Sequence, residues 1–144
     1  MLSNGCKYAI RSLIYLAVNG KDKPIGLKEI SDELNIPFPY LSKVMQNLTK
    51  HAYLKSTKGP TGGYILNKKA SEVSLLEIVK LIDGLSIFND CLIGLTSCLD
   101  SDTTDHCPTY SRFEPVRKEL YNYFETETIQ HLKEELVSKG NIRI

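Results

Sequence analysis

The stretch from residue 36 to residue 66 most constrains the fold, because it combines a helical apolar period with a glycine-rich turn. Four apolar residues recur at i, i+3, i+4 and i+7, the spacing of one buried helical face: Leu41, Val44, Met45 and Leu48. Two short β-prone runs follow, and the segment KGPTGG joins them through a proline and paired glycines. The pattern predicts a helix over Pro39–His51 followed by a two-stranded hairpin over Leu54–Leu66.

The face of this helix opposite the apolar stripe is polar and contains no acidic residue: Tyr40, Ser42, Lys43, Gln46, Asn47 and Lys50. The hairpin turn adds a second polar, basic group of residues: Lys58, Thr61, Gly62, Gly63 and Tyr64. Amide and ammonium side chains on a helix suit base edges in the major groove of DNA, and a basic turn suits phosphates. These residues are therefore candidate DNA contacts. The alternative is a surface helix packed by an ordinary hairpin.

Two shorter helical segments precede this stretch. The first is expected to start at Ser3 or Asn4 as N-cap and to bury a stripe along one face: Ala9, Ile10, Leu13, Ile14 and Ala17. The second is expected over Leu27–Leu34. Helix, helix, helix, hairpin is the order of a winged helix-turn-helix. Ser74 and Glu77 then form a capping box for a fourth helix that ends at Gly84, so we expect one DNA-binding domain over residues 1–84.

The charge of the chain is divided between its halves. Residues 1–70 carry 11 Lys+Arg against 4 Asp+Glu, whereas residues 71–144 carry 7 against 13, and these differences of +7 and −6 sum to the net +1. A basic first half predicts a polyanionic partner for that half. No apolar run approaches the roughly 20 residues that span a bilayer, and no signal peptide opens the chain. We therefore expect a cytoplasmic protein with no membrane association.

Residues 85–110 show no clear period and contain three of the four cysteines: Cys91, Cys98 and Cys107. In a reducing compartment this clustering favours metal, iron–sulfur or redox chemistry over structural disulfides. Direct thiol oxidation, a zinc site and inert loop cysteines are the alternatives. His106 is the only histidine placed for coordination, and Cys6, next to an apolar helix face, is expected to be a small buried hydrophobe. The segment is a candidate sensor.

The last part of the chain, residues 111–144, is expected to form two helices. The longer one starts near Ser111 and carries a stripe of apolar residues: Phe113, Val116, Leu120, Tyr123 and Phe124. A long helix outside the winged core needs a surface that buries its stripe, and a second copy of the chain is the simplest candidate. Packing on the same chain is the alternative. A final helix is expected over about Glu127–Val137, with Ile129, Leu132 and Leu136 facing inward.

Three segments together resemble the Rrf2 family of bacterial winged-helix regulators: CKYAIRSLIYLA, LKEISDELNIPFPYLSKVMQNL and KGPTGGYIL. The resemblance covers nearly the whole chain and implies a homodimer that binds double-stranded DNA, with the late long helix as the dimerisation helix. Tyr40, Ser42 and Lys43 stand where members contact DNA. Lys58 stands where the family usually has an arginine that enters the minor groove, and lysine cannot fork two hydrogen bonds there. Gly62 and Gly63 would let the backbone approach the sugar-phosphate closely.

The resemblance also implies an iron–sulfur cluster as a possible cofactor, because cluster-binding members carry three cysteines in this segment. The spacing here, Cys91-x6-Cys98-x8-Cys107, is looser than the family's five intervening residues. In one branch the fourth ligand is a histidine, and Tyr110 occupies its position. In the nitric-oxide-sensing branch it is an aspartate, and Lys7 occupies that position. Other candidates for a fourth ligand are His106, Cys6 and the acids of the segment.

The sequence therefore predicts a mainly α-helical fold with a small β wing, a winged helix-turn-helix followed by a long dimerisation helix. It predicts a dimeric transcription regulator, in the pattern of a repressor, that the cysteine segment modulates. An enzyme is not expected, because no second histidine or acid stands at a recognisable spacing from the cysteines. The alternative is a winged-helix protein-interaction or metal-binding module that does not bind DNA.

Overall fold

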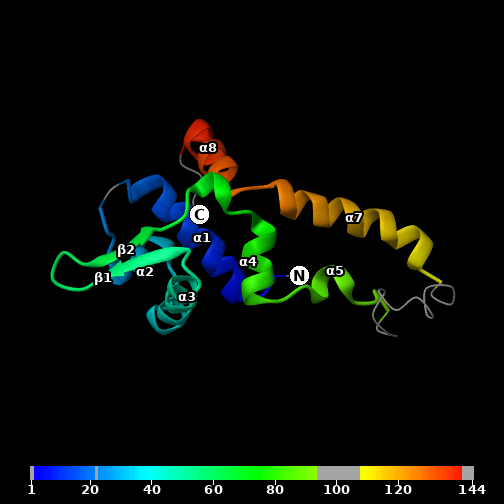
Figure 1. The fold of residues 1–144 in the computed structure, drawn as a ribbon, viewed down its shortest axis with the longest axis horizontal. Helices are drawn as coiled ribbons and strands as arrows, with labels where there is room; N and C mark the ends of the chain where they lie inside the picture. Colours follow the sequence, from blue (N-terminus) through cyan, green and yellow to red (C-terminus); the bar gives the residue numbers. More distant parts are fainter. Residues whose placement is uncertain (1, 22, 94–107, 141–144) are drawn as a thin grey trace.

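The structure, a computed structural model, describes residues 2–21, 23–93 and 108–140. The winged part comprises α1 (Asn4–Asn19), α2 (Leu27–Leu34), α3 (Phe38–Lys50), β1 (Leu54–Thr57), β2 (Gly63–Leu66), a 3₁₀ turn (Ala70–Glu72) and α4 (Leu75–Ile82). The remaining described helices are α5 (Ser86–Asn89), α7 (Tyr110–Thr126) and α8 (Ile129–Lys139). Cys98, His106 and Cys107 lie outside the described residues. The wing and α7 lie at opposite ends of an elongated molecule (Figure 1).

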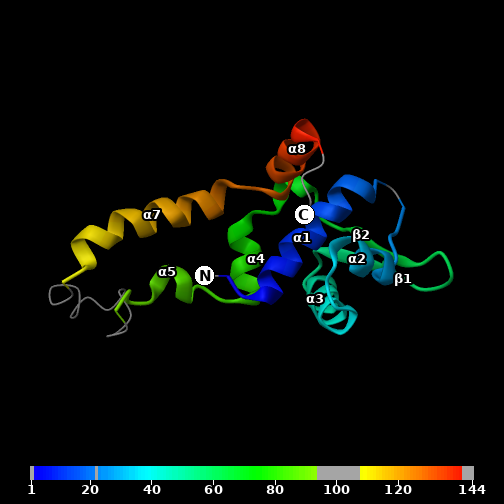
Figure 2. The ribbon, with the colours of Figure 1, turned by 180° about the vertical axis from the view of Figure 1, so that it is seen from behind.

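The hydrophobic core surrounds α1, which contacts α2, α3, α4, α8 and β2. The stripe expected on α3 is buried, so that prediction is confirmed: Leu41, Val44, Met45 and Leu48. On α1 the expected stripe is also buried except for Ile10, which is half-buried at the edge of the core. Opposite sides of α1 are covered by α3 and α8, as both ribbon views show (Figures 1 and 2).

Most helix ends lie where the capping signals place them. Ser3 is the N-cap of α1 and accepts a hydrogen bond from the Cys6 backbone N–H at 3.1 Å. Ser74 and Glu77 form the expected capping box of α4, with N–H donors at 3.1 and 3.3 Å. Helix α3 starts at Phe38, one residue earlier than expected, because the Pro37 carbonyl already accepts the first N–H groups of the helix. It ends at Lys50 rather than His51.

The hairpin is an antiparallel pair in which Leu54 faces Leu66 and Thr57 faces Gly63. A third backbone segment joins it, because Ile25 and Tyr64 exchange N–H···O=C hydrogen bonds of 3.0 and 2.8 Å. This bridge fastens the second strand to the turn before α2. The sequence pattern does not indicate it, since Ile25 stands alone between a proline and a glycine.

One helix falls in the segment expected to have no regular structure. Residues Ser86–Asn89 form α5, and Phe88 within it is buried. Its ring packs edge-on against Tyr121 and Phe124 of α7, with ring centroids 5.4 and 5.5 Å apart. The prediction missed α5 because four residues are too few to show a helical period.

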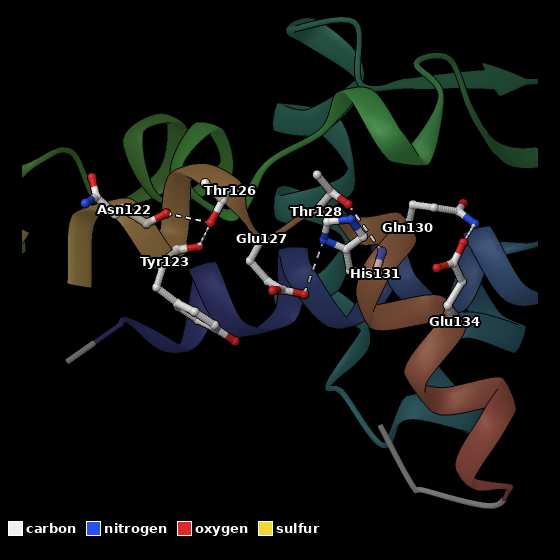
Figure 3. A network of polar contacts seen from close by, with 8 residues as sticks. All are labelled: Asn122, Tyr123, Thr126, Glu127, Thr128, Gln130, His131 and Glu134. Atoms are coloured by element: carbon white, nitrogen blue, oxygen red, sulfur yellow. Dashed lines mark hydrogen bonds and ion pairs between the residues drawn. The ribbon is translucent and has the colours of Figure 1, made fainter. Parts of the chain in front are cut away.

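Helix α7 extends away from the winged core, and α8 turns back to pack on α1 (Figures 1 and 2). The joint between them is held by backbone contacts: Leu75 N–H donates to the Glu127 carbonyl at 2.9 Å, and Ile129 N–H donates to the Val73 carbonyl at 3.0 Å. Figure 3 shows the side chains at this joint, where Thr128 caps α8 and Thr126 closes the end of α7. The base of α7 is thereby fixed to the start of α4.

None of the helices described, over residues 2–21, 23–93 and 108–140, has both the length and the apolar character needed to cross a membrane.

Candidate nucleic-acid interface

The turn between α2 and α3 is fixed by polar contacts from three places in the chain. Asn35 adopts the left-handed conformation (φ 49°), which asparagine tolerates better than most residues. The Ser31 hydroxyl donates to the Ile36 carbonyl at 2.7 Å, and Arg11 on α1 donates to the Leu34 carbonyl. These contacts satisfy one carbonyl at the end of α2 and one in the turn that follows it, and so they hold the turn in place.

The residues predicted to contact DNA lie on the side of α3 that the core leaves uncovered. Tyr40, Lys43, Gln46 and Lys50 are exposed, whereas Ser42 and Asn47 are half-buried at its edges. The Gln46 side-chain amide donates to the Ser42 hydroxyl at 3.3 Å, which orients the amide along the helix. The structure therefore places the six predicted residues of α3 on one continuous surface.

This surface is cationic and contains no carboxylate from α3 itself. Lys43 and Lys50 on α3, with Lys55 and Lys58 in the hairpin, are all exposed. In the part of the chain that the structure describes, none of these four ammonium groups makes an ion pair. Ammonium groups that are not neutralised within the chain remain available to phosphate oxygens.

Lys68, at the base of the wing, behaves differently from those four lysines. Its ammonium lies 4.1 Å from the centroid of the Tyr53 ring and 3.5 Å from a Glu77 carboxylate oxygen. Burial and the Glu77 charge raise the pKa of the Tyr53 hydroxyl, and Lys68 opposes this shift. Asn67 also donates to the Ala52 carbonyl at 2.8 Å. These contacts hold the base of the wing against the turn that follows α3 and against α4.

Gly62 and Gly63 have internal structural reasons to be glycine. A Cβ on Gly63 would lie 2.3 Å from the Ile25 carbonyl oxygen, and a Cβ on Gly62 would lie 2.3 Å from the Thr57 carbonyl oxygen. Both glycines therefore permit close backbone contacts within the wing and with the turn before α2. That the backbone at Gly62 and Gly63 also approaches the sugar-phosphate of DNA stays a prediction. Lys58, Thr61 and Tyr64 lie in the same hairpin, Lys58 and Thr61 exposed and Tyr64 half-buried.

Of the predicted cysteine ligands, the described residues include Cys91, which is half-buried just after α5. Among residues 2–21, 23–93 and 108–140, no group of three or more His, Cys, Asp or Glu side chains is placed to hold a metal ion. Cys6 is fully buried in the core, as expected. Burial, with the nearby Asp83 charge, raises the pKa of its thiol to about 12. Burial therefore keeps this thiol protonated at neutral pH.

Only some residues of the apolar stripe expected on α7 are packed against the same chain. Leu120 and Phe124 pack against the core, together with Tyr121, which the stripe did not include. Val116 and Tyr123 are 54% and 52% exposed. The alternative of packing on the same chain therefore holds for part of the helix, at Leu120 and Phe124. Phe113 is half-buried, so Val116 and Tyr123 are the residues of the expected stripe that stay largely exposed to solvent.

A buried arginine accompanies this arrangement. Arg117 is 7% exposed, and its Nη1 donates to the Glu114 carboxylate at 2.8 Å. Its guanidinium carbon lies 5.2 Å from the centroid of the Phe113 ring. The other nitrogens, Nε and Nη2, are buried and make no hydrogen bond with any residue that the structure describes. Sequence reasoning missed Arg117, because arginine is usually a surface residue.

Two further residues of the interface were missed. Arg11 holds the end of α2, and no local signal identifies a contact 23 residues away in the sequence. Phe38 is 48% exposed at the first position of α3. A signal was present for Phe38, because it stands four residues before Ser42 and so borders the polar side of the helix.

Comparison with known proteins agrees with this architecture. Residues 2–135 match the model of the Rrf2 family, described as an iron-dependent transcriptional regulator. An HTH-type transcriptional regulator of Aquifex aeolicus is 31% identical over 133 residues, covering 92% of this chain and 90% of the relative. The HTH-type transcriptional regulator IscR of Klebsiella pneumoniae is 27% identical over 131 residues, covering 91% of this chain and 78% of that protein.

Among solved structures, CymR, the global cysteine regulator of Bacillus subtilis, superposes with a TM-score of 0.78. The superposition covers 94% of this chain and 98% of CymR at 20% identity, which supports the winged-helix fold. The family match spans most of the chain, and it includes α3, the wing and α7. This protein is therefore a DNA-binding transcription regulator and not an enzyme, and it belongs to the Rrf2 family.

Proposed function

We propose that this regulator acts as a homodimer, with α3 of each copy in the major groove of double-stranded DNA and each wing at the adjoining backbone. The contacts from α3 are assigned to Tyr40, Ser42, Lys43, Gln46, Asn47 and Lys50. Those from the wing are assigned to Lys58, Thr61, Gly62, Gly63 and Tyr64. Dimers of helix-turn-helix proteins bind two half-sites about one helical turn of DNA apart.

The observation that carries this proposal is the charge of the α3 surface. Lys43 and Lys50 are exposed, α3 has no carboxylate, and the amides of Gln46 and Asn47 lie between these lysines along the helix. Lysines suit phosphate oxygens, while glutamine and asparagine suit the adenine edge in the major groove. Affinity would come mainly from the lysines, and sequence preference from the amides.

The exposed part of α7 supports assembly as a dimer. Val116 and Tyr123 stand seven residues apart, which places them on the same side of the helix. Both belong to α7, which extends from the core in the direction away from the wing (Figure 1). Two copies joined through α7 would leave both α3 surfaces free for DNA. This is the arrangement that a symmetric operator requires.

The cysteine segment is the proposed sensor. Cys91, Cys98 and Cys107 would supply three thiolates to an iron–sulfur cluster, with His106 as a candidate fourth ligand. Such a cluster would supply a redox-sensitive cross-link between α5, which ends just before Cys91, and α7, which begins just after Cys107. Direct oxidation of the same thiols is the alternative sensor chemistry. Either change would alter how α7 lies against α5, and so the spacing of the two α3 helices.

DNA binding is tested by fluorescence anisotropy with duplexes selected from a random library, at several salt concentrations. The logarithm of the binding constant should fall with the logarithm of salt at a slope of roughly −0.9 for each phosphate neutralised. Lys43→Ala should make the slope shallower by about one such contact. Lys133→Ala, on α8 across the molecule from α3, should leave the slope unchanged. A flat salt response of the unmodified protein would instead favour an interaction module.

Sensing is tested on protein purified without oxygen, by its visible absorbance together with iron and acid-labile sulfide on the same sample. Matching iron and sulfide with visible bands supports the cluster. A colourless sample without either leaves thiol chemistry, which mass spectrometry after peroxide treatment would detect as a disulfide. Cys98→Ala should remove the response while the dimer stays folded. Identical DNA-binding curves for both proteins under all conditions would contradict the sensor role.

A further inference from the structure

The start of α3 carries four consecutive exposed apolar residues: Pro37, Phe38, Pro39 and Tyr40. Phe38 and Tyr40 are 48% and 63% exposed, although the same helix buries four apolar side chains on its other side. An exposed run of this length is not needed for folding, and such runs in folded proteins usually serve binding. Tyr40 is already assigned to DNA, but Phe38 is not.

The same residues make the helix start a poor site for phosphate. Helix N-termini bind anions through backbone N–H groups that have no partner within the helix. Pro37 and Pro39 have no N–H, and the N–H groups of Tyr40 and Leu41 already donate to the Pro37 carbonyl at 3.0 and 3.1 Å. Phe38 therefore retains the one N–H that the first turn could offer. The end of α3 nearest the bases is apolar where anion-binding helices are polar.

Phe38 also stands at the border between the buried stripe of α3 and the side that carries the polar base-reading candidates, seven residues before Met45 and four before Ser42. Phe38, Ser42 and Gln46 follow at intervals of four residues, and the Gln46 amide donates to the Ser42 hydroxyl. The N-terminal residues of a recognition helix lie deepest among the base edges. The one apolar group on the major-groove edges of the bases is the C5 methyl of thymine, and phenylalanine is among the side chains that contact it.

We propose that Phe38 reads thymine, by packing its ring on the C5 methyl of one thymine in each half-site. This rests on the proposed placement of α3 in the major groove and adds a specificity residue to it. The exposed lysines of the same helix, Lys43 and Lys50, favour DNA over a protein as the partner of the exposed face of α3, because a protein partner would have to be acidic to match them.

The test removes the methyl groups and changes nothing else. In the operator selected with the unmodified protein, each thymine is replaced in turn by deoxyuridine, which lacks the C5 methyl. At one position in each half-site, deoxyuridine should weaken binding by about fourfold, because one buried methyl is lost. Substitution at that position in both half-sites together should weaken binding by roughly fifteenfold. Phe38→Ala should bind the thymine and deoxyuridine operators equally well at that position. Phe38→Leu, which keeps an apolar side chain, should retain most of the difference.

The outcomes separate this inference from the function on which it rests. If the unmodified protein selects no duplex, the placement of α3 on DNA is itself wrong. A different result is that the unmodified protein and Phe38→Ala lose the same affinity at every deoxyuridine substitution of a selected duplex. In that case the proposed role of Phe38 is wrong, and the proposal that the protein binds DNA stands. Val137→Ala is the matched control, because Val137 is an exposed apolar residue on α8 and should leave every ratio unchanged.

Discussion

The winged core and the arm formed by α5 and α7 use apolar residues in opposite ways. In the core, the stripes of α1 and α3 are buried against each other, and the exposed side of α3 is polar beyond its first turn. In the arm, Val116 and Tyr123 face solvent while Arg117 is buried. The core is complete within one chain. The arm has the surface of an element that a second copy completes, which supports the proposed homodimer.

The largest expected difference between the two regions is in thiol reactivity. Because the pKa of the buried Cys6 thiol is raised to about 12 from 9.0, its thiolate fraction at pH 8 is on the order of 1000-fold lower than in the unfolded chain. Iodoacetamide should therefore modify Cys6 far more slowly in native protein than in urea, as measured by mass spectrometry. Cys91, half-buried in the arm, should react faster than Cys6. Equal rates for Cys6 in both states would contradict its burial.

The same thiol makes a prediction about pH. The folded state holds the Cys6 proton more tightly than the unfolded state does, so this contribution to stability is fully present below about pH 9. It should be lost as pH rises from 9 toward 12. Cys6→Ala should flatten the loss of unfolding free energy over that interval relative to the unmodified protein.

Core and arm should also differ in the cost of removing an apolar side chain. Leu48→Ala should lower the free energy of unfolding by about 3 kcal/mol, because Leu48 is fully buried. Val116→Ala should change it by less than about 0.5 kcal/mol at a protein concentration where the chain is monomeric. Val116→Ala should instead weaken self-association in sedimentation experiments. A stable monomer at all concentrations would contradict the assignment of α7 to dimerisation.

Two neighbouring glycines sharpen the account of the wing. Gly63→Ala should lower the free energy of unfolding by about 2 kcal/mol. The new Cβ would clash with the Ile25 carbonyl and break the backbone hydrogen bonds between Ile25 and Tyr64. Gly26→Ala is the matched control, since a Cβ there meets nothing within 4 Å. Gly26→Ala should change the free energy of unfolding by less than about 0.5 kcal/mol. Alanine is a poorer N-cap, but it also makes the unfolded chain less flexible, and the two effects oppose each other. Urea titrations of both variants decide between internal packing and DNA contact as the reason for Gly63.

The smallest expected effects concern the buried ion pair of the arm. Glu114→Gln should lower the free energy of unfolding by about 1 kcal/mol, because the buried Arg117 guanidinium then has no carboxylate partner at this position. Arg117→Met should leave the free energy of unfolding unchanged or raise it, since Nε and Nη2 are buried without hydrogen bonds to the described residues. Thermal unfolding of the two variants separates them. A larger loss for Arg117→Met than for Glu114→Gln would show that the guanidinium contributes more than its ion pair.

The success of sequence reasoning also differs between the two regions. The stripe of α3, the bounds of α2 and the Ser74–Glu77 capping box were predicted, because each depends on residues at most a few positions apart. The Arg11 contact and the Ile25–Tyr64 bridge join distant residues, and no local pattern encodes them. In α7 the helical period was visible, but a period does not say whether its own chain or another copy covers the stripe.

The candidate DNA surface was predicted more fully than the sensor. The six polar residues of α3 were placed together because a helix maps sequence spacing directly onto one side. Phe38 was overlooked because an apolar residue beside an apolar stripe is expected to be buried. For the sensor, the spacing of the cysteines indicates thiol chemistry but not the geometry of the ligands. Cys6, which was expected to be a small buried hydrophobe, is fully buried.

The backbone bridge between Ser74 and Thr128 anchors one end of α7 to the core, so that α7 can act as a lever arm that pivots at this joint. The helix has 17 residues and so measures about 25 Å at about 1.5 Å per residue. A tilt of about 10° at the fulcrum corresponds to a movement of about 4 Å at the far end. The cysteine segment joins the lever at that far end, where a given force has its greatest turning effect on the core. If the cysteine segment is the sensor proposed above, a change in its thiol chemistry would act on α7 where a given force turns it most effectively against the DNA-binding half.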